Sequence, residues 1–133
     1  MKKFDNILRK FDLHYFGNGN HKISFEKMMK LFKEGRAFII DVRTRLENEH
    51  LRFNFAKNIP IDEIPDSIDK IPKDKTIVLF CSSSTRATIV YAYLLLLDYD
   101  VRILVDNISE IASNFKPGYM LKNLEPPDKR HDR

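Results

Sequence analysis

Cysteine and tryptophan are nearly missing from this 133-residue chain, which has one cysteine and no tryptophan. One cysteine cannot form a disulfide within the chain, so nothing in the sequence points to an oxidising compartment. No apolar run approaches the ~20 residues that span a bilayer. Charged residues interrupt the start of the chain, where a signal peptide would need an apolar stretch. We therefore expect a cytoplasmic protein without a membrane-spanning segment.

The charged residues narrow the classes of function further. The net charge of +4 is mild. It could favour the binding of small anions or of an acidic partner, or it could simply be the charge of an ordinary protein surface. Lysine and arginine are scattered, and no aromatic-basic motif of an RNA-binding module is present, so we expect no nucleic-acid partner. The four histidines lack the spacing of metal ligands, so we predict no metal and no cofactor.

Short apolar strands alternate with helical patterns along the chain. The predicted strands are 37–42, 56–61, 75–80 and 101–105, and the predicted helices are 25–34, 86–97 and 108–115, with a short helix or turn over 62–71. This alternation predicts an α/β fold of three layers, α/β/α, with a mainly parallel central sheet of about five strands.

We divide the chain into an N-terminal extension (1–22), one domain (23–124) and a tail (125–133) that we expect to be disordered. In the extension, Phe4, Ile7, Leu8 and Phe11 recur at the spacing of an amphipathic helix. Such a helix could lie on a membrane surface or pack on the domain or on a second subunit. We favour packing, and we expect a monomer or a homodimer with no membrane partner.

The lone Cys81 directly follows the predicted strand 75–80. Ligands of parallel sheets bind beyond the carboxyl ends of the strands, which is where this thiol would lie. The next four residues must turn the chain into a helix, and such a turn can aim backbone N–H groups at an anion. They are Ser82, Ser83, Ser84 and Thr85.

Several features of this loop would favour a thiolate. The helix that follows adds the positive end of its dipole, and Arg86 adds a permanent positive charge. The hydroxyl groups add hydrogen-bond donors. A thiolate in such a cradle is suited to attack on sulfur or phosphorus. The alternative is that Cys81 is a small buried hydrophobic residue; we favour a functional thiol.

Five segments in order resemble the single-domain rhodanese-like sulfurtransferase family, which carries sulfur as a cysteine persulfide. The first, FIIDVR, is similar to the family's Asp-Val-Arg signature after a strand. The fourth matches the strand, catalytic cysteine and active-site loop. The segments are FIIDVR (38–43), RLENEH (45–50), AKNIPIDEI (56–64), KDKTIVLFCSSSTRA (73–87) and VRILVDNI (101–108).

The resemblance implies a sulfurtransferase that moves sulfane sulfur from thiosulfate or a related donor to a thiophilic acceptor, which is cyanide in vitro. Cys81 would carry the persulfide, and Ser82 to Arg86 would bind the donor anion. Asp41 and Arg43 would lie near the loop in a supporting role, or form a structural ion pair, which we favour. His50 would be structural. The partners would be a small sulfur-containing anion and a thiol acceptor, which could be a protein.

The sequence departs from the family's pattern in ways that bear on the site. Ser84 stands where the family's loop often has glycine, so a positive φ there would be strained. Ser82 and Ser83 stand where some members carry a basic residue that helps bind thiosulfate, so we expect weaker thiosulfate binding. The segment after His50 is longer than is usual in the family and contains Phe53 and Phe55. These two side chains could lie in the core or form an exposed apolar patch, and we favour the core.

Two other functions stay open. Related cell-cycle phosphatases have five residues between the cysteine and the arginine of the loop, whereas Cys81 and Arg86 are separated by four. The shorter loop favours sulfur over phosphate. The domain could also be a non-catalytic sulfur carrier or a rhodanese-like protein-interaction module.

Overall fold

The fold is built on one five-stranded sheet in which every pair of neighbouring strands is parallel. The computed structural model describes residues 2–123. The strand order is β1-β5-β4-β2-β3, which places β4 at the centre. The strands are β1 (Lys22–Ile23), β2 (Ala37–Asp41), β3 (Lys57–Asn58), β4 (Thr76–Phe80) and β5 (Val101–Leu104).

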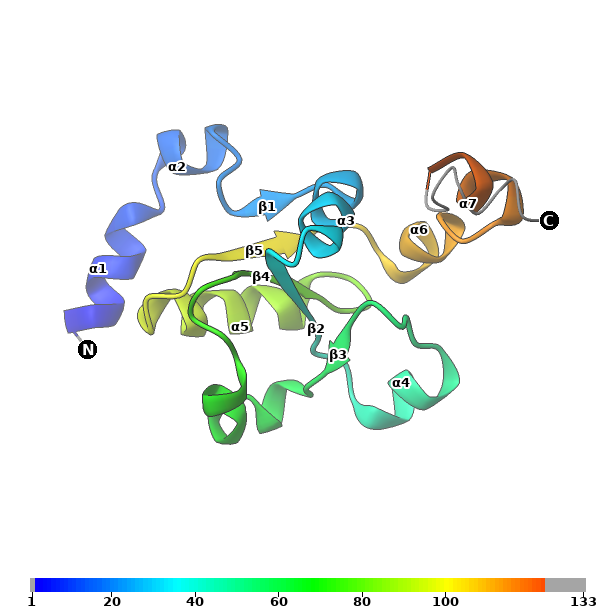
Figure 1. Cartoon of the computed structure of the whole chain (residues 1–133). Coiled ribbons are helices and arrows are strands. Elements are labelled where there is room, and N and C mark those ends of the chain that lie inside the picture. The colour runs from blue at the N-terminus through cyan, green and yellow to red at the C-terminus, as the bar shows by residue number, and fades with distance from the viewer. Residues whose placement is uncertain (1, 124–133) are drawn as a thin grey trace.

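Helices flank the sheet on both faces, with α5 on one face and α3 and α6 on the other (Figure 1). This arrangement confirms the predicted α/β fold. The α-helices are α1 (Lys2–Lys10), α2 (Leu13–Gly17), α3 (Phe25–Lys33), α4 (Arg45–His50), α5 (Thr85–Leu96), α6 (Ile108–Ser113) and α7 (Pro117–Asn123). Two short 3-10 helices, η1 (Ile61–Glu63) and η2 (Pro65–Lys70), connect β3 to β4.

The alternation of side chains along the strands explains the two cores. Ile40 and Leu79 face α5, whereas Ile39 and Val78 face α3 and α6. Both faces of the strands are therefore buried, which is why β2 and β4 are nearly continuous apolar runs. Phe53 and Phe55 belong to the core on the α3 side, as we expected.

The buried face of α5 leaves two of the helix's large apolar side chains exposed. Ile89 is 59% exposed, and Tyr93 is exposed as well. The residues of α5 whose side chains are buried are Ala87, Val90, Tyr91 and Leu94. Tyr91 is drawn inward because its hydroxyl bonds to the Tyr15 hydroxyl of α2, a contact that the helical period of α5 cannot reveal.

The N-terminal segment forms two helices rather than one. Asp12 interrupts the predicted helix and caps α2, since its carboxylate accepts the N–H of Tyr15 at 3.0 Å. Ile7 is buried in the contact between α1 and α5, and Phe11 packs against the core. The boundary that we expected between residues 22 and 23 falls inside β1, a strand that we did not predict.

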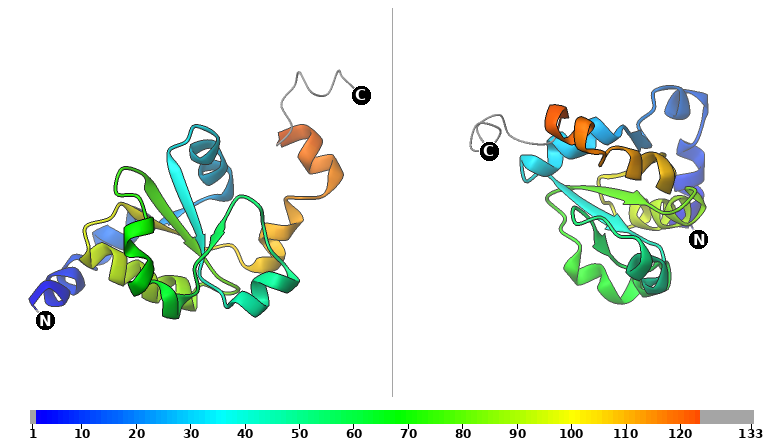
Figure 2. Two further views of the ribbon diagram at one scale, coloured as in Figure 1. Left: turned by 60° about the horizontal axis from the view of Figure 1, so that its bottom comes forward. Right: turned by 90° about the vertical axis from the view of Figure 1, so that its right-hand side faces the viewer.

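The two ends of the described chain lie on opposite sides of the domain, with α1 beyond one end of α5 and α7 beside α6 (Figure 2). The tail predicted over 125–133 lies outside the described residues. Within residues 2–123, no helix is long and apolar enough to cross a membrane.

Candidate active site

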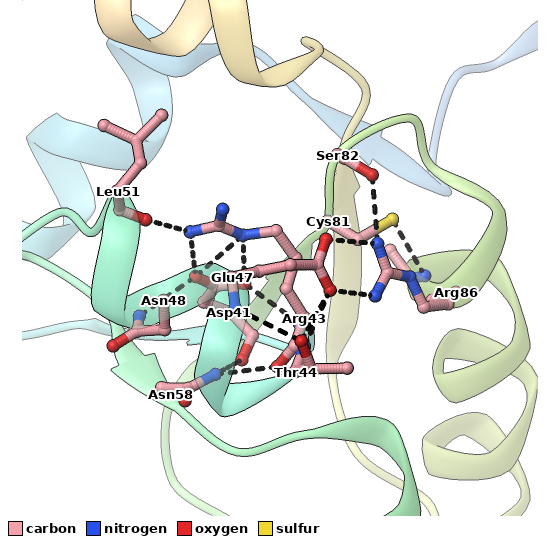
Figure 3. Close-up of polar contacts among 11 residues, drawn as sticks. Asp41, Arg43, Thr44, Glu47, Asn48, Leu51, Asn58, Cys81, Ser82 and Arg86 are labelled. Carbon is pink, nitrogen blue, oxygen red and sulfur yellow. Dashed lines mark hydrogen bonds and ion pairs between the residues drawn. The ribbon is translucent and has the colours of Figure 1, made fainter.

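Cys81 lies at the carboxyl end of the central strand β4, and its side chain is 2% exposed. Its Sγ accepts a hydrogen bond from the backbone N–H of Ala87 at 3.4 Å. Ala87 belongs to the first turn of α5, where N–H groups have no partner within the helix. The sulfur thus lies at the amino end of α5, where the helix dipole is positive (Figure 3).

The loop between β4 and α5 is held against the segment that follows β5. The backbone N–H of Ile108 donates to the carbonyl of Ser82 at 3.2 Å, and the Ser84 hydroxyl lies 3.4 Å from the carbonyl of Val105, to which it donates. Ser84 is the N-cap residue of α5 and has a φ of 74°. This residue therefore has the left-handed backbone conformation for which we expected strain.

The Arg86 guanidinium forms an ion pair with an acidic residue that we did not predict as part of the site. The guanidinium donates to both carboxylate oxygens of Glu47, at 2.6 Å and 2.9 Å, and to the Ser82 hydroxyl at 3.0 Å. Arg86 thus clamps the loop to α4 (Figure 3). The cation that we expected to stabilise an anionic substrate is already balanced by a carboxylate.

Glu47 is oriented by a capping box at the start of α4. Its backbone N–H donates to the Thr44 hydroxyl at 3.2 Å, and its carboxylate accepts the Thr44 backbone N–H at 3.0 Å. The spacing Thr44-x-x-Glu47 is the sequence signature of such a box and could have identified Glu47 as a fixed carboxylate. The hydrogen bonds from Arg86, and secondarily those from Thr44, hold the pKa of Glu47 at about 2.

Asp41 and Arg43 form a buried ion pair at the end of β2, with side chains 1% and 4% exposed. The Arg43 Nη2 donates to Asp41 Oδ2 at 2.7 Å and to the Leu51 carbonyl at 2.6 Å. The Asn58 amide donates to the backbone carbonyls of both residues, at 3.0 Å and 2.9 Å. These bonds join β2, β3 and the end of α4.

The structure brings the predicted site residues to one edge of the sheet, but it gives them different surroundings. Ser82 and Ser84 use their hydroxyls within the protein, as described above, whereas the side chains of Ser83 and Thr85 are exposed. His50 is exposed at the end of α4, which gives no support to the structural role that we expected for it.

The family of this chain follows from its sequence. The sequence model of the rhodanese-like domain family matches residues 24–114, more than half of the chain. The chain belongs to this family. The match runs from the N-cap of α3 to the residue after α6, so it includes the whole Cys81 loop and leaves α1, α2 and α7 outside. No curated protein sequence matches the chain.

Solved structures share the rhodanese-like fold. Reduced CoADR-RHD from Bacillus anthracis has 19% identity and a TM-score of 0.66; the alignment covers 83% of this chain but only 19% of that one. The human single-domain sulfurtransferase has 23% identity and a TM-score of 0.61, with 74% and 100% covered. A rhodanese-like domain protein from Staphylococcus aureus has 26% identity and a TM-score of 0.60, with 67% and 88% covered.

Replacing Ser84 with glycine is expected to stabilise this rhodanese-like domain. A left-handed conformation destabilises the folded state by about 1–2 kcal/mol for an L-residue other than glycine. Glycine removes this strain, but its greater conformational entropy also stabilises the unfolded chain by about 0.4–1 kcal/mol, which offsets part of the gain. Denaturant unfolding should therefore give Ser84→Gly a free energy of unfolding higher by up to about 1 kcal/mol. Ser83→Gly is the matched control: Ser83 does not have a positive φ, so its replacement should destabilise. The prediction fails if both variants move the same way.

Replacing Glu47 with glutamine should lower stability at neutral pH by about 0.5–1 kcal/mol, the upper range for a partly exposed ion pair. The folded pKa of Glu47, about 2, lies below its ordinary value of 4.5. The stabilisation is therefore complete above pH 4.5 and is lost as the pH falls toward 2. Urea unfolding across this range should show the wild-type and Glu47→Gln curves converging. Glu63→Gln, which breaks the more exposed Arg45–Glu63 pair, should change stability less at neutral pH. A gap for Glu47→Gln that stays constant down to pH 2 would contradict the assignment.

Proposed function

We propose that this rhodanese-like protein is a sulfurtransferase in which Cys81 carries sulfane sulfur as a persulfide. One observation carries the proposal: the Cys81 Sγ lies at the end of the central strand and accepts the Ala87 N–H at the start of α5. A sulfur held there as an anion is a nucleophile with a fixed position. The four-residue spacing between Cys81 and Arg86 suits a single sulfur atom better than a tetrahedral phosphate.

The reaction has two half-reactions. The Cys81 thiolate attacks the outer sulfur of thiosulfate, a new S–S bond forms, and the S–S bond of thiosulfate breaks so that its electron pair leaves with sulfite. Cyanide then attacks the outer sulfur of the persulfide, thiocyanate leaves, and the electron pair of the broken bond restores the Cys81 thiolate. Each step balances without an external oxidant, and the sequence of steps predicts ping-pong kinetics.

The surroundings of Cys81 favour small donors that bind weakly. The side chain is 2% exposed, so a compact anion reaches the sulfur more readily than a bulky donor does. The bidentate contact with Glu47 balances the Arg86 charge, which removes one attraction for thiosulfate. The near-complete burial also supports a second candidate, a carrier that accepts one sulfur and holds it. The cytoplasm, where thiols stay reduced, suits either role.

The test is the intact mass of the reduced protein before and after thiosulfate, followed by cyanide. We expect a gain of one sulfur atom, found on the peptide that contains Cys81, and its release as thiocyanate over repeated cycles. Loading without repeated release would favour the carrier. A folded protein that gains no sulfur from thiosulfate or another sulfane donor, with its thiol confirmed as reduced, would refute both roles. Turnover of an aryl phosphate would favour the phosphatase.

A further inference from the structure

The helix α5 is apolar on all its sides, although only one side packs against the sheet. Residues 87–97 contain no charged side chain. On the outward side, Ile89 is 59% exposed and Tyr93 is 37% exposed. A helix that is hydrophobic all round is ordinarily buried all round, whereas a helix that faces water has charged or polar residues on its outer side. The outward face of α5 therefore has the composition of an interface.

Four residues of this face form one narrow stripe that runs the whole length of the helix. They follow one another at intervals of four, three and four positions, which is the spacing with which a helix presents a seam to a second helix. None of them is among the buried residues of α5, and small and large side chains alternate along the stripe. The four residues are Thr85, Ile89, Ala92 and Leu96.

The order of small and large side chains makes this stripe complementary to itself. When two copies of α5 lie antiparallel about a twofold axis between Ile89 and Ala92, Ile89 faces the partner's Ala92. Leu96 faces the partner's Thr85 in the same way. Each large side chain then meets a small one, as close packing between helices requires. A parallel pair would place each residue against its own copy, so large side chains would collide and the alanines would leave a gap.

Charge and area also favour a second copy of the chain as the occupant of this face. The net charge of +4 makes two copies repel each other, and an uncharged face lets them meet without bringing like charges into contact. A stable interface buries about 800 Å² on each partner, more than one helix face provides. The helix α1 packs beside α5 and adds apolar surface, since Phe4 and Leu8 are exposed.

We propose that the protein forms a twofold-symmetric homodimer in which the outward stripes of the two α5 helices pack antiparallel. The neighbouring α1 helices widen the interface. Because Thr85 directly follows the loop that begins at Cys81, the contact with the partner's Leu96 places the carboxyl end of one α5 beside the sulfur-site loop of the other copy. The dimer does not depend on the proposed sulfurtransferase function and is tested without any sulfur chemistry.

The first test is the molar mass of the full chain in solution, measured by light scattering over a range of concentrations. We expect a dimer for the wild type and a monomer for Ile89→Asp. Self-association should weaken about hundredfold or more, because the twofold axis brings two unpaired carboxylates into the interface. Ile89 is largely exposed within one copy, so circular dichroism and urea unfolding of the monomeric variant should show an intact fold.

The matched control is Leu121→Asp, which puts the same charge on an exposed leucine of α7 and should stay dimeric. A wild type that is monomeric throughout, or a folded Ile89→Asp that remains dimeric, would overturn the proposal. A monomeric wild type that sediments with vesicles of phosphatidylcholine and phosphatidylglycerol, and loses this binding in Ile89→Asp, would assign the face to a membrane instead.

The orientation of the helices is tested by disulfide formation in Cys81→Ser protein, where only introduced cysteines react. Thr85→Cys and Leu96→Cys are prepared separately, and oxidation of their mixture should link one copy of each. Either variant alone should not cross-link, because identical ends of antiparallel helices lie about 16 Å apart along the axis, beyond the reach of a disulfide. Equal cross-linking of each variant alone would overturn the antiparallel arrangement. A mixture that gives no cross-link while the protein is dimeric would overturn the α5 seam.

Discussion

Replacing Cys81 with serine is expected to reduce thiocyanate formation from thiosulfate and cyanide to the level of the buffer blank. A serine hydroxyl is not ionised near neutral pH and has no sulfur with which to form a persulfide, so both half-reactions are lost together. The measurement is steady-state thiocyanate production, with the intact mass of each protein after thiosulfate. Residual sulfur uptake by the variant would show that the mass gain of the native protein is not on this thiol.

The same substitution should leave the fold intact, which makes the loss of activity interpretable. Serine is close to cysteine in size, and its oxygen can accept the Ala87 N–H that now donates to Sγ at 3.4 Å. We therefore expect the free energy of unfolding to change by about 1 kcal/mol or less. Ser109→Ala, which removes an exposed hydroxyl from α6, is the control and should retain the full rate. A Cys81→Ser variant that retains the wild-type rate of thiocyanate formation would remove Cys81 from the mechanism.

The local pattern of apolar residues was enough to predict the central strands of this fold and their parallel arrangement. The runs over β2 and β4 are apolar without interruption because both faces of these strands are buried. Once β4 was located, the position of Cys81 at the carboxyl edge followed from the topology of parallel sheets. The expectation of strain at Ser84 came from the resemblance to the family, whose loop often has glycine at this position, and Ser84 has a φ of 74°.

The features that the sequence did not reveal depend on contacts between distant segments. Glu47 and Arg86 are 39 residues apart, and no spacing rule links a capping box on one helix to the first turn of another. The strand β1 has two residues, too few for a period, and it exists because its backbone pairs with β5. Tyr91 is buried because α2 supplies a partner for its hydroxyl. Each of these needs the tertiary arrangement before it can be identified.

Replacing Asp41 with alanine is expected to cause the largest loss of stability among the variants considered. The substitution leaves the Arg43 guanidinium buried with only the Leu51 carbonyl as a partner, and breaking a buried pair in this way costs about 3–5 kcal/mol. A small domain has only about 5–15 kcal/mol of stability in total. Urea unfolding at neutral pH should therefore shift strongly, whereas Glu34→Gln, which breaks the exposed Arg36–Glu34 pair, should be nearly neutral.

The double variant Asp41→Leu/Arg43→Met decides whether this pair is structural or supports the chemistry. Replacing both charges by apolar groups removes the unpaired cation, so stability should recover by several kcal/mol relative to Asp41→Ala. Because Asp41 and Arg43 bond to each other, to Asn48, to Asn58 and to the Leu51 carbonyl, we expect the refolded double variant to load sulfur on Cys81 as the wild type does. A double variant that is as stable as the wild type but takes up no sulfur would instead assign the pair a supporting role in sulfur transfer.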